Sequence, residues 1–169
     1  MGSDKRVFHI KKGKHSSGIH FKLLTGNYII FKASLSKSCL YQFGDVDDFD
    51  VNKLCGFSTS YTHMRQSARI GWRCIDGKRF EIVTYTHNNG QIEFDEIKTL
   101  GVVEVDEEFI CSINNNDGYF VYTFRKASGQ ELFIVKTEKK NLRFPIKYLL
   151  YPYFGGNKTA PNDMYVTIT

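Results

Sequence analysis

The sequence predicts an all-β protein in which antiparallel strands form a two-sheet sandwich of about ten to twelve strands. Composition is the first observation: the 169 residues include 14 Phe and 10 Tyr, and aromatic side chains suit the pleated surface of a strand. Periodicity is the second. Short alternating or apolar runs recur about every ten residues and are separated by turn dipeptides, which is the spacing of sandwiches and barrels.

Each expected strand is such a run, ended by a turn signal. In residues 27–35 the odd-numbered side chains share one face, and all of them after the first are apolar. Asp76-Gly77 separates residues 66–75 from residues 79–87, and it indicates a hairpin because Gly allows the positive φ of a tight turn. The other expected strands are residues 91–96 after Asn89-Gly90, then 108–113, 119–125 and 131–136, and a closing strand at 164–168.

Residues 1–169 are expected to form one domain, because no repeat or linker divides the chain. Residues 1–16 are expected to be either a flexible arm or an edge strand. The least regular stretches are residues 43–53 and 137–146. The first carries four Asp but lacks the Gly and the terminal Glu of an EF-hand. We therefore expect a solvated acidic loop or a short helical turn there, with no metal site and no cofactor.

Charge and cysteines suggest the partners and the compartment. The net charge of +5 favours anionic partners such as acidic glycans or nucleotides, but the basic residues are too scattered to indicate nucleic acid. The four Cys share no CxxC spacing, and Cys74 and Cys111 fall in apolar strand patterns, so zinc is not expected. Residues 1–15 contain no apolar signal segment, and no run reaches the length of a membrane span. We expect a cytoplasmic protein without membrane contact, although a mature secreted form would share these features.

The first candidate site lies on the expected hairpin. Arg69 and Arg73 share one strand face, and Gly71 between them leaves a dip that a ligand or a neighbouring side chain can approach. A guanidinium fork binds carboxylate or phosphate, whereas the alternative is a surface ladder in which one arginine pairs with Glu81. The ligand-binding candidates of this hairpin are His63, Arg69, Arg73, Glu81, Tyr85 and His87.

The second candidate site is the segment 151–161, which joins aromatic residues, two adjacent Gly and a polar loop. Its candidates are Tyr151, Tyr153, Asn157 and Lys158. Aromatic faces beside an amide and a Lys suit sugar stacking and hydroxyl recognition, whereas the alternative is a tight loop that shapes a sheet edge. Residues 15–20 carry His, Ser and Gly, but their spacing matches no catalytic motif, so an ordinary turn is expected.

The strand count, the length and the closing strand after a Gly-rich loop resemble the concanavalin-like jelly-roll class, which includes lectins, laminin-G-type modules, glycan hydrolases and alginate-type lyases. The resemblance is one of architecture and implies a jelly-roll sandwich. The lyases place Arg, Gln, His and Tyr on a concave sheet. This chain's equivalents in kind would be Arg69, Arg73, Tyr85 and His87. However, residues 67–73 lack the lyase Glu, no Gln-x-His triplet occurs, and residues 93–96 are misspaced for the hydrolase motif. These departures argue against catalysis.

We therefore expect a non-catalytic sandwich that binds an anionic glycan or a nucleotide-like small molecule. One alternative is a lyase for a uronate polymer, in which Arg69 neutralises the carboxylate and His87 or Tyr85 removes the adjacent proton. The other is a structural or assembly role, for instance a virion decoration, an interaction module or a homo-oligomer. The ten Tyr cannot all be core, and exposed aromatic residues are enriched at interfaces.

Overall fold

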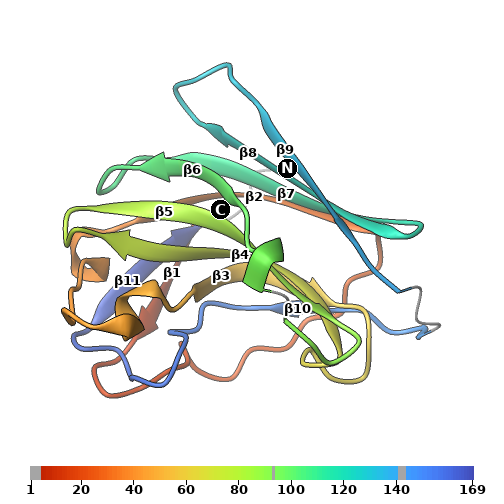
Figure 1. Ribbon diagram of the computed structural model, residues 1–169, viewed down its shortest axis with the longest axis horizontal. Helices are drawn as coiled ribbons and strands as arrows, with labels where there is room; N and C mark the ends of the chain where they lie inside the picture. The colour runs from red at the N-terminus through yellow and green to blue at the C-terminus, as the bar shows by residue number, and fades with distance from the viewer. Residues whose placement is uncertain (1–4, 93, 141–143) are drawn as a thin grey trace.

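The structure, a computed structural model, describes residues 5–92, 94–140 and 144–169, and within them eleven strands form two antiparallel sheets (Figure 1). The six-stranded sheet has the order β1 (Arg6–Ile10), β11 (Met164–Ile168), β2 (Tyr28–Leu35), β7 (Phe109–Asn116), β8 (Tyr119–Lys126) and β9 (Phe133–Glu138). The five-stranded sheet has the order β10 (Tyr148–Leu150), β3 (Asn52–Ser58), β4 (Gln66–Ile75), β5 (Arg79–Asn88) and β6 (Thr99–Val103). The predicted all-β sandwich is confirmed.

The β4–β5 hairpin forms at Asp76-Gly77, as the sequence predicts, and both turn residues have positive φ. Because the two strands pair without a register shift, Arg69 lies opposite Tyr85 and Arg73 lies opposite Glu81. Side chains alternate between the faces of a strand, so these four residues lie on the face that points away from the second sheet. The hairpin thus places the main sequence candidates on one surface.

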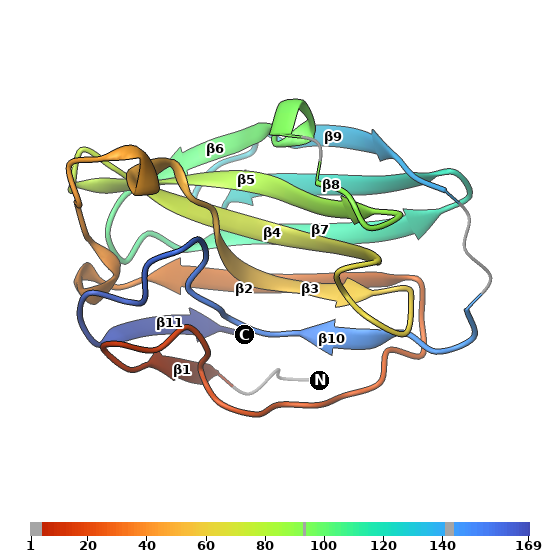
Figure 2. The same ribbon diagram turned by 60° about the horizontal axis from the view of Figure 1, so that its bottom comes forward.

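The core lies between the two sheets, where β4 packs on β7 and β6 packs on β8 and β9 (Figure 2). The predicted apolar face of β2 is confirmed, because Phe31, Ala33 and Leu35 are buried. The largest fully buried side chains include Trp72, Phe80, Phe109, Phe120, Tyr122 and Phe124. The Tyr122 hydroxyl is hydrogen-bonded to that of Thr86 at 2.5 Å, so its polar tip is satisfied inside the core.

The run at residues 91–96 is not a strand, contrary to the prediction. The chain instead forms a 3-10 helix, η3 (Phe94–Glu96), and Glu93 lies outside the described residues. Thr84 of β5 explains the change, because its hydroxyl accepts a hydrogen bond from the Lys98 amide at 2.9 Å and donates one to the Glu96 carbonyl at 3.0 Å. These bonds hold the segment that precedes β6 against β5, and the pairing of β5 with β6 carries a register shift between Ile82 and Val83.

The irregular acidic stretch forms η2 (Val46–Phe49), a short helical turn of the kind the sequence predicts, and η1 (Lys37–Cys39) precedes it. The Asp45 carboxylate accepts a hydrogen bond from the Asp47 amide at 3.0 Å and thereby begins η2. All four cysteines are free thiols. None of the helices in the described ranges is long and apolar enough to cross a membrane.

Candidate functional site

A cleft of about 560 Å³ lies on the outer face of the five-stranded sheet. Strands β3, β4 and β5 form its floor, which carries Lys53, Arg69, Tyr85 and His87. Residues 148–153 form one wall, with part of the segment that precedes β2. Tyr148, Tyr151, Tyr153 and Phe21 supply aromatic rings, and His63 and Met64 border the other side.

Arg69 occupies the floor of the cleft with 7% of its surface exposed. Its Nε atom is fully buried and has no hydrogen-bond partner, and its guanidinium forms no ion pair within the described part of the chain. Burial lowers the pKa of Arg69 to about 10, because loss of water disfavours the charged form. The group nevertheless stays protonated at neutral pH, so the floor holds a positive charge without a carboxylate beside it.

Lys53 places a second positive charge on the floor. Its Nζ lies 4.3 Å from the centre of the Tyr85 ring, which is a cation–π contact. Burial, together with repulsion by Arg69, lowers the pKa of Lys53 to about 8, against a weaker opposing attraction from Asp50. Lys53 is therefore mostly protonated at neutral pH and titrates just above it.

Two of the histidines that line the cleft, His63 and His87, are neutral at physiological pH. Burial, and then the charge of Arg69, lower the pKa of His87 to about 4 and also lower that of His63. The Ser67 hydroxyl lies 3.4 Å from Nδ1 of His87. The His87 ring centre lies 5.4 Å from that of Tyr85 and 6.3 Å from that of His63. These rings present polar edges to the cleft without adding charge.

The wall of the cleft is an irregular extension of the five-stranded sheet. Tyr153 is bridged through its backbone to Lys53 on one side and to Ser16 on the other, with hydrogen bonds of 2.8 and 2.9 Å to Lys53. Three ring pairs then join the segment before β2 to the residues around β10. They are His15 with Tyr153 at 5.3 Å, His20 with Tyr151 at 5.0 Å, and Phe21 with Tyr148 at 6.1 Å between ring centres. We call these three pairs the aromatic wall.

Six of the residues that the sequence suggests line this cleft, namely His63, Arg69, Tyr85, His87, Tyr151 and Tyr153. Arg73 and Glu81 do not line it, because the Arg73 Nε donates to a Glu81 carboxylate oxygen at 2.5 Å, as in the alternative surface ladder. The dip over Gly71 is filled by Val51, whose Cγ1 would lie 2.3 Å from a Cβ at that glycine. Val51 thus separates the two arginines, and Arg69 is buried rather than exposed.

Asn157 and Lys158 also lie outside the cleft. Lys158 forms ion pairs with Asp45 and with Asp47, the latter at 3.1 Å, while Asn157 is exposed. The loop after Tyr153 packs on β3, where the amide of Gly155 donates to Asn52 at 2.8 Å, and no residue beyond Tyr153 lines the cleft among the described residues. Only the first part of the segment 151–161 therefore contributes to the site.

Sequence reasoning missed Lys53, Tyr148 and the segment before β2. Lys53 stands between the apolar residues Val51 and Leu54, and a lysine at such a place is the signal that could have indicated a functional position. Ser16 and His20 belong to the stretch expected to be an ordinary turn, yet both line the cleft. Their position depends on pairing with residues some 130 positions later in the chain, which no local pattern reveals.

Comparison with known proteins bears on the fold. No protein-family model and no curated protein matches the sequence. Among solved structures, the alginate lyase from Klebsiella pneumoniae superposes with a TM-score of 0.64 at 7% identity, over 83% of this chain and 56% of the lyase. The chain has the concanavalin-like jelly-roll architecture. A functionally unknown protein from Saccharomyces cerevisiae superposes with a TM-score of 0.59 at 12% identity, over 98% of this chain and 84% of that protein.

At these identities the likeness concerns the fold alone. The chain spans little more than half of the lyase, so that enzyme's activity does not follow for it. The function has to be argued from the cleft.

Proposed function

We propose that the cleft binds an acidic oligosaccharide through the carboxylate groups of the sugar. The observation that carries this proposal is the buried guanidinium of Arg69, which has no ion-pair partner in a cleft whose described lining contains no Asp or Glu. A buried charge without a counter-ion costs free energy, and a ligand carboxylate would pair with the terminal guanidinium nitrogens through charge-assisted hydrogen bonds. Lys53 would hold a second anionic group nearby.

The aromatic wall supports a sugar rather than an inorganic anion. Tyr151 and Tyr153 line one side of the cleft, and an aromatic face beside polar ring edges suits the alternating apolar and hydroxyl surfaces of a pyranose. The volume falls within the range of about 300–1,000 Å³ that is usual for small-ligand sites. An acidic di- or trisaccharide therefore fits both the chemistry and the size of the cleft.

Calorimetry with oligomers of mannuronate and guluronate tests the proposal, with neutral oligosaccharides and nucleotides as the comparison ligands. We expect acidic oligosaccharides to bind and Arg69→Met to weaken binding by about 10- to 100-fold, the value of a hydrogen bond to a buried charge. Arg73→Met is the matched control, because it removes the same group from the same strand outside the cleft. Equal losses from both variants, or tighter binding of a nucleotide, would contradict the proposal.

A lyase that cleaves a uronate polymer is the second candidate function. It is favoured by His87, which stays unprotonated beside Tyr85, while Tyr85 is paired across the hairpin with Arg69. In such a reaction Arg69 would bind the uronate carboxylate and His87 would take the proton from C5. A C4–C5 double bond would then form as the C4–O bond breaks, and the Tyr85 hydroxyl would protonate the leaving oxygen.

The pKa values favour binding over this reaction. A histidine with a pKa of about 4 is a weak base, and burial raises the pKa of Tyr85, which makes its hydroxyl a weaker acid. The unsaturated product absorbs ultraviolet light, so a continuous absorbance assay decides the question. Turnover that is lost in His87→Ala but retained in Arg73→Met would establish the lyase. If the absorbance does not change with oligomers that bind by calorimetry, the cleft binds these oligomers without cleaving them.

A further inference from the structure

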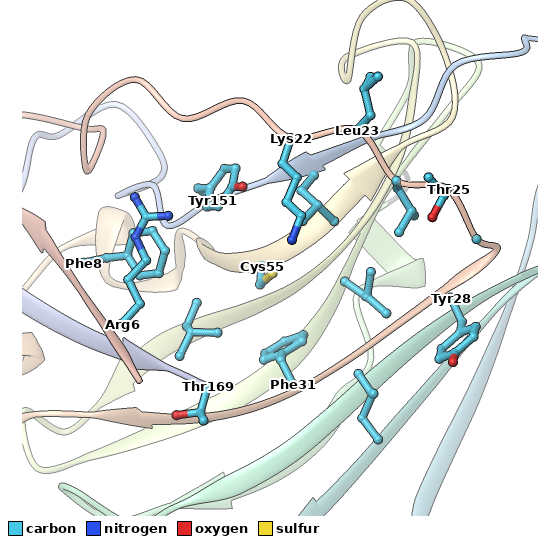
Figure 3. Close-up of a pocket in the computed structure, with 16 residues that line it drawn as sticks. Arg6, Phe8, Lys22, Leu23, Thr25, Tyr28, Phe31, Cys55, Tyr151 and Thr169 are labelled. Atoms are coloured by element: carbon cyan, nitrogen blue, oxygen red, sulfur yellow. The ribbon is translucent and has the colours of Figure 1, made fainter. Parts of the chain in front are cut away.

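A second pocket, of about 590 Å³, opens between the two sheets at the edge where the five-stranded sheet ends (Figure 3). Its walls come from β1, β2, β3, β10 and β11 and from residues 22–26, which cross from one sheet to the other. We call it the edge pocket. Of the described residues it shares only Leu149 and Tyr151 with the cleft, whose floor lies on the opposite face of the five-stranded sheet.

The interior of the edge pocket is an unfilled end of the hydrophobic core. Its apolar walls are half-buried side chains that pack against the core on one side and line the pocket on the other. They are Leu24, Ile29, Cys55, Leu149 and Ile168, with the buried ring of Phe31 among them. The space exists because β10 has only three residues, so the five-stranded sheet does not fully cover β2 and β11 at this edge.

The mouth of the edge pocket is cationic. Arg6 and Lys22 line it, and its described lining contains no Asp or Glu. Lys22 extends from the segment before β2 into the pocket (Figure 3), and its ammonium makes no hydrogen bond or ion pair with any described residue. Arg6 donates to Nδ1 of His20 at 2.9 Å and lies 4.6 Å from the centre of the Phe8 ring, and its guanidinium forms no ion pair with any residue that the structure describes.

We propose that the edge pocket binds a single-chain aliphatic carboxylate of the fatty-acid class. The hydrocarbon tail would lie among the core side chains at Ile29 and Leu149, where it removes apolar surface from water. The carboxylate would remain at the mouth, bound to Lys22 and to the in-plane N–H groups of Arg6 that do not bond to His20. This site is separate from the acidic-sugar cleft and does not depend on the function proposed there.

A chain-length series tests the proposal on the unaltered protein, by calorimetry below the critical micelle concentration. Burial of each methylene is worth about fourfold in affinity, so decanoate should bind roughly fifteen times tighter than octanoate. Dodecanoate should continue the trend until the pocket is full. Methyl NMR locates the ligand, with shifts expected at Ile29, Leu149 and Ile168 and none at Ile82, which lies in the core away from the pocket.

Two variants test the two halves of the site. Lys22→Ala should weaken dodecanoate binding about fivefold and leave dodecanol binding unchanged, since only the carboxylate needs the cation. In this variant the backbone carbonyl of residue 22 still accepts a hydrogen bond from the Leu149 amide, at 2.8 Å, so the segment stays attached to β10. Lys78→Ala, at the β4–β5 turn, is the matched control. Ile29→Trp, which fills the pocket, should abolish binding of the fatty acid but not of an acidic oligosaccharide.

Several results would overturn the proposal. They are the absence of saturable binding, an affinity independent of chain length, equal effects of Lys22→Ala and Lys78→Ala, or methyl shifts confined to the cleft. Binding to anionic vesicles without binding of the monomeric fatty acid would also overturn it. The chain-length series and the NMR map need no substitution, so failure of Ile29→Trp to fold would not weaken the test.

Discussion

Arg69→Met should make the protein more stable while it weakens ligand binding. The pKa of Arg69 is lowered from 12.5 to about 10, and each pKa unit is worth about 1.4 kcal/mol, so the buried charge costs on the order of 3 kcal/mol. Because the cleft is open to water, part of this penalty is relieved, and we expect a gain of about 1–3 kcal/mol. Met keeps most of the apolar stem of Arg69 and has no unsatisfied donor.

Urea unfolding at pH 7 without ligand measures this effect. For a chain of this size m is about 2–3 kcal/mol/M, so the midpoint should rise by about 0.3–1.5 M with m unchanged. Arg73→Met is again the control, and it should lower the midpoint because it breaks the ion pair with Glu81. If Arg69→Met also unfolds earlier than the parent, the guanidinium stabilises the fold, and the argument from its missing partner is wrong.

Three further predictions concern pH and backbone packing. The pKa of Lys53 is about 8 in the folded protein and 10.5 in the unfolded chain, so the folded protein loses this proton at a lower pH. Between pH 8 and 9 the free energy of unfolding of the parent should therefore rise by about 1 kcal/mol relative to Lys53→Met, as urea unfolding would measure. His87 has a folded pKa of about 4, below its unfolded value of 6.5, so the free energy of unfolding should fall as the pH drops from 6.5 to 4. His87→Gln should remove that loss. An NMR titration of His87 with a midpoint near pH 6.5 would contradict the prediction. Gly56→Ala should cost more than about 2 kcal/mol, because its Cβ would lie 2.1 Å from the Ala68 carbonyl oxygen. Gly90→Ala, which meets no atom within 4 Å, should cost only about 1 kcal/mol from its positive φ, as thermal unfolding would show.

The fold was predictable because local patterns carry it. Alternation along residues 66–75 and the Asp76-Gly77 turn define the β4–β5 hairpin, and from its register the approach of Arg69 to Tyr85 follows. The mistake at residues 91–96 arose because the Thr84 side chain competes for backbone groups, which an alternating pattern cannot reveal. Local sequence therefore predicts strands well, and it fails where a side chain from another strand bonds to the main chain.

The candidate site was only partly predictable, because long-range contacts decide which arginine is available. Arg69 and Arg73 are equivalent in the sequence, each on the outer face of one strand. Val51 then fills the space over Gly71, and Arg73 pairs with Glu81 beyond that block. The aromatic wall similarly requires contact between chain segments before β2 and after β10. Neither the availability of Arg69 nor the aromatic wall can be predicted from the spacing of residues along the sequence.

The geometry that buries Arg69 also fixes its orientation. Gly56 lies beside Arg69 in the β3–β4 pairing, and a Cβ at Gly56 would lie 2.6 Å from the Arg69 Cα and 2.8 Å from its Cγ. Because Gly56 has no side chain, β3 approaches the stem of Arg69 closely and restricts its rotamers. A guanidinium that is already held in place loses little conformational entropy when it binds a carboxylate. The close approach of β3 thus favours a rigid anion-binding site over a flexible surface arginine, and the stability cost of the buried charge is the consequence of that rigidity.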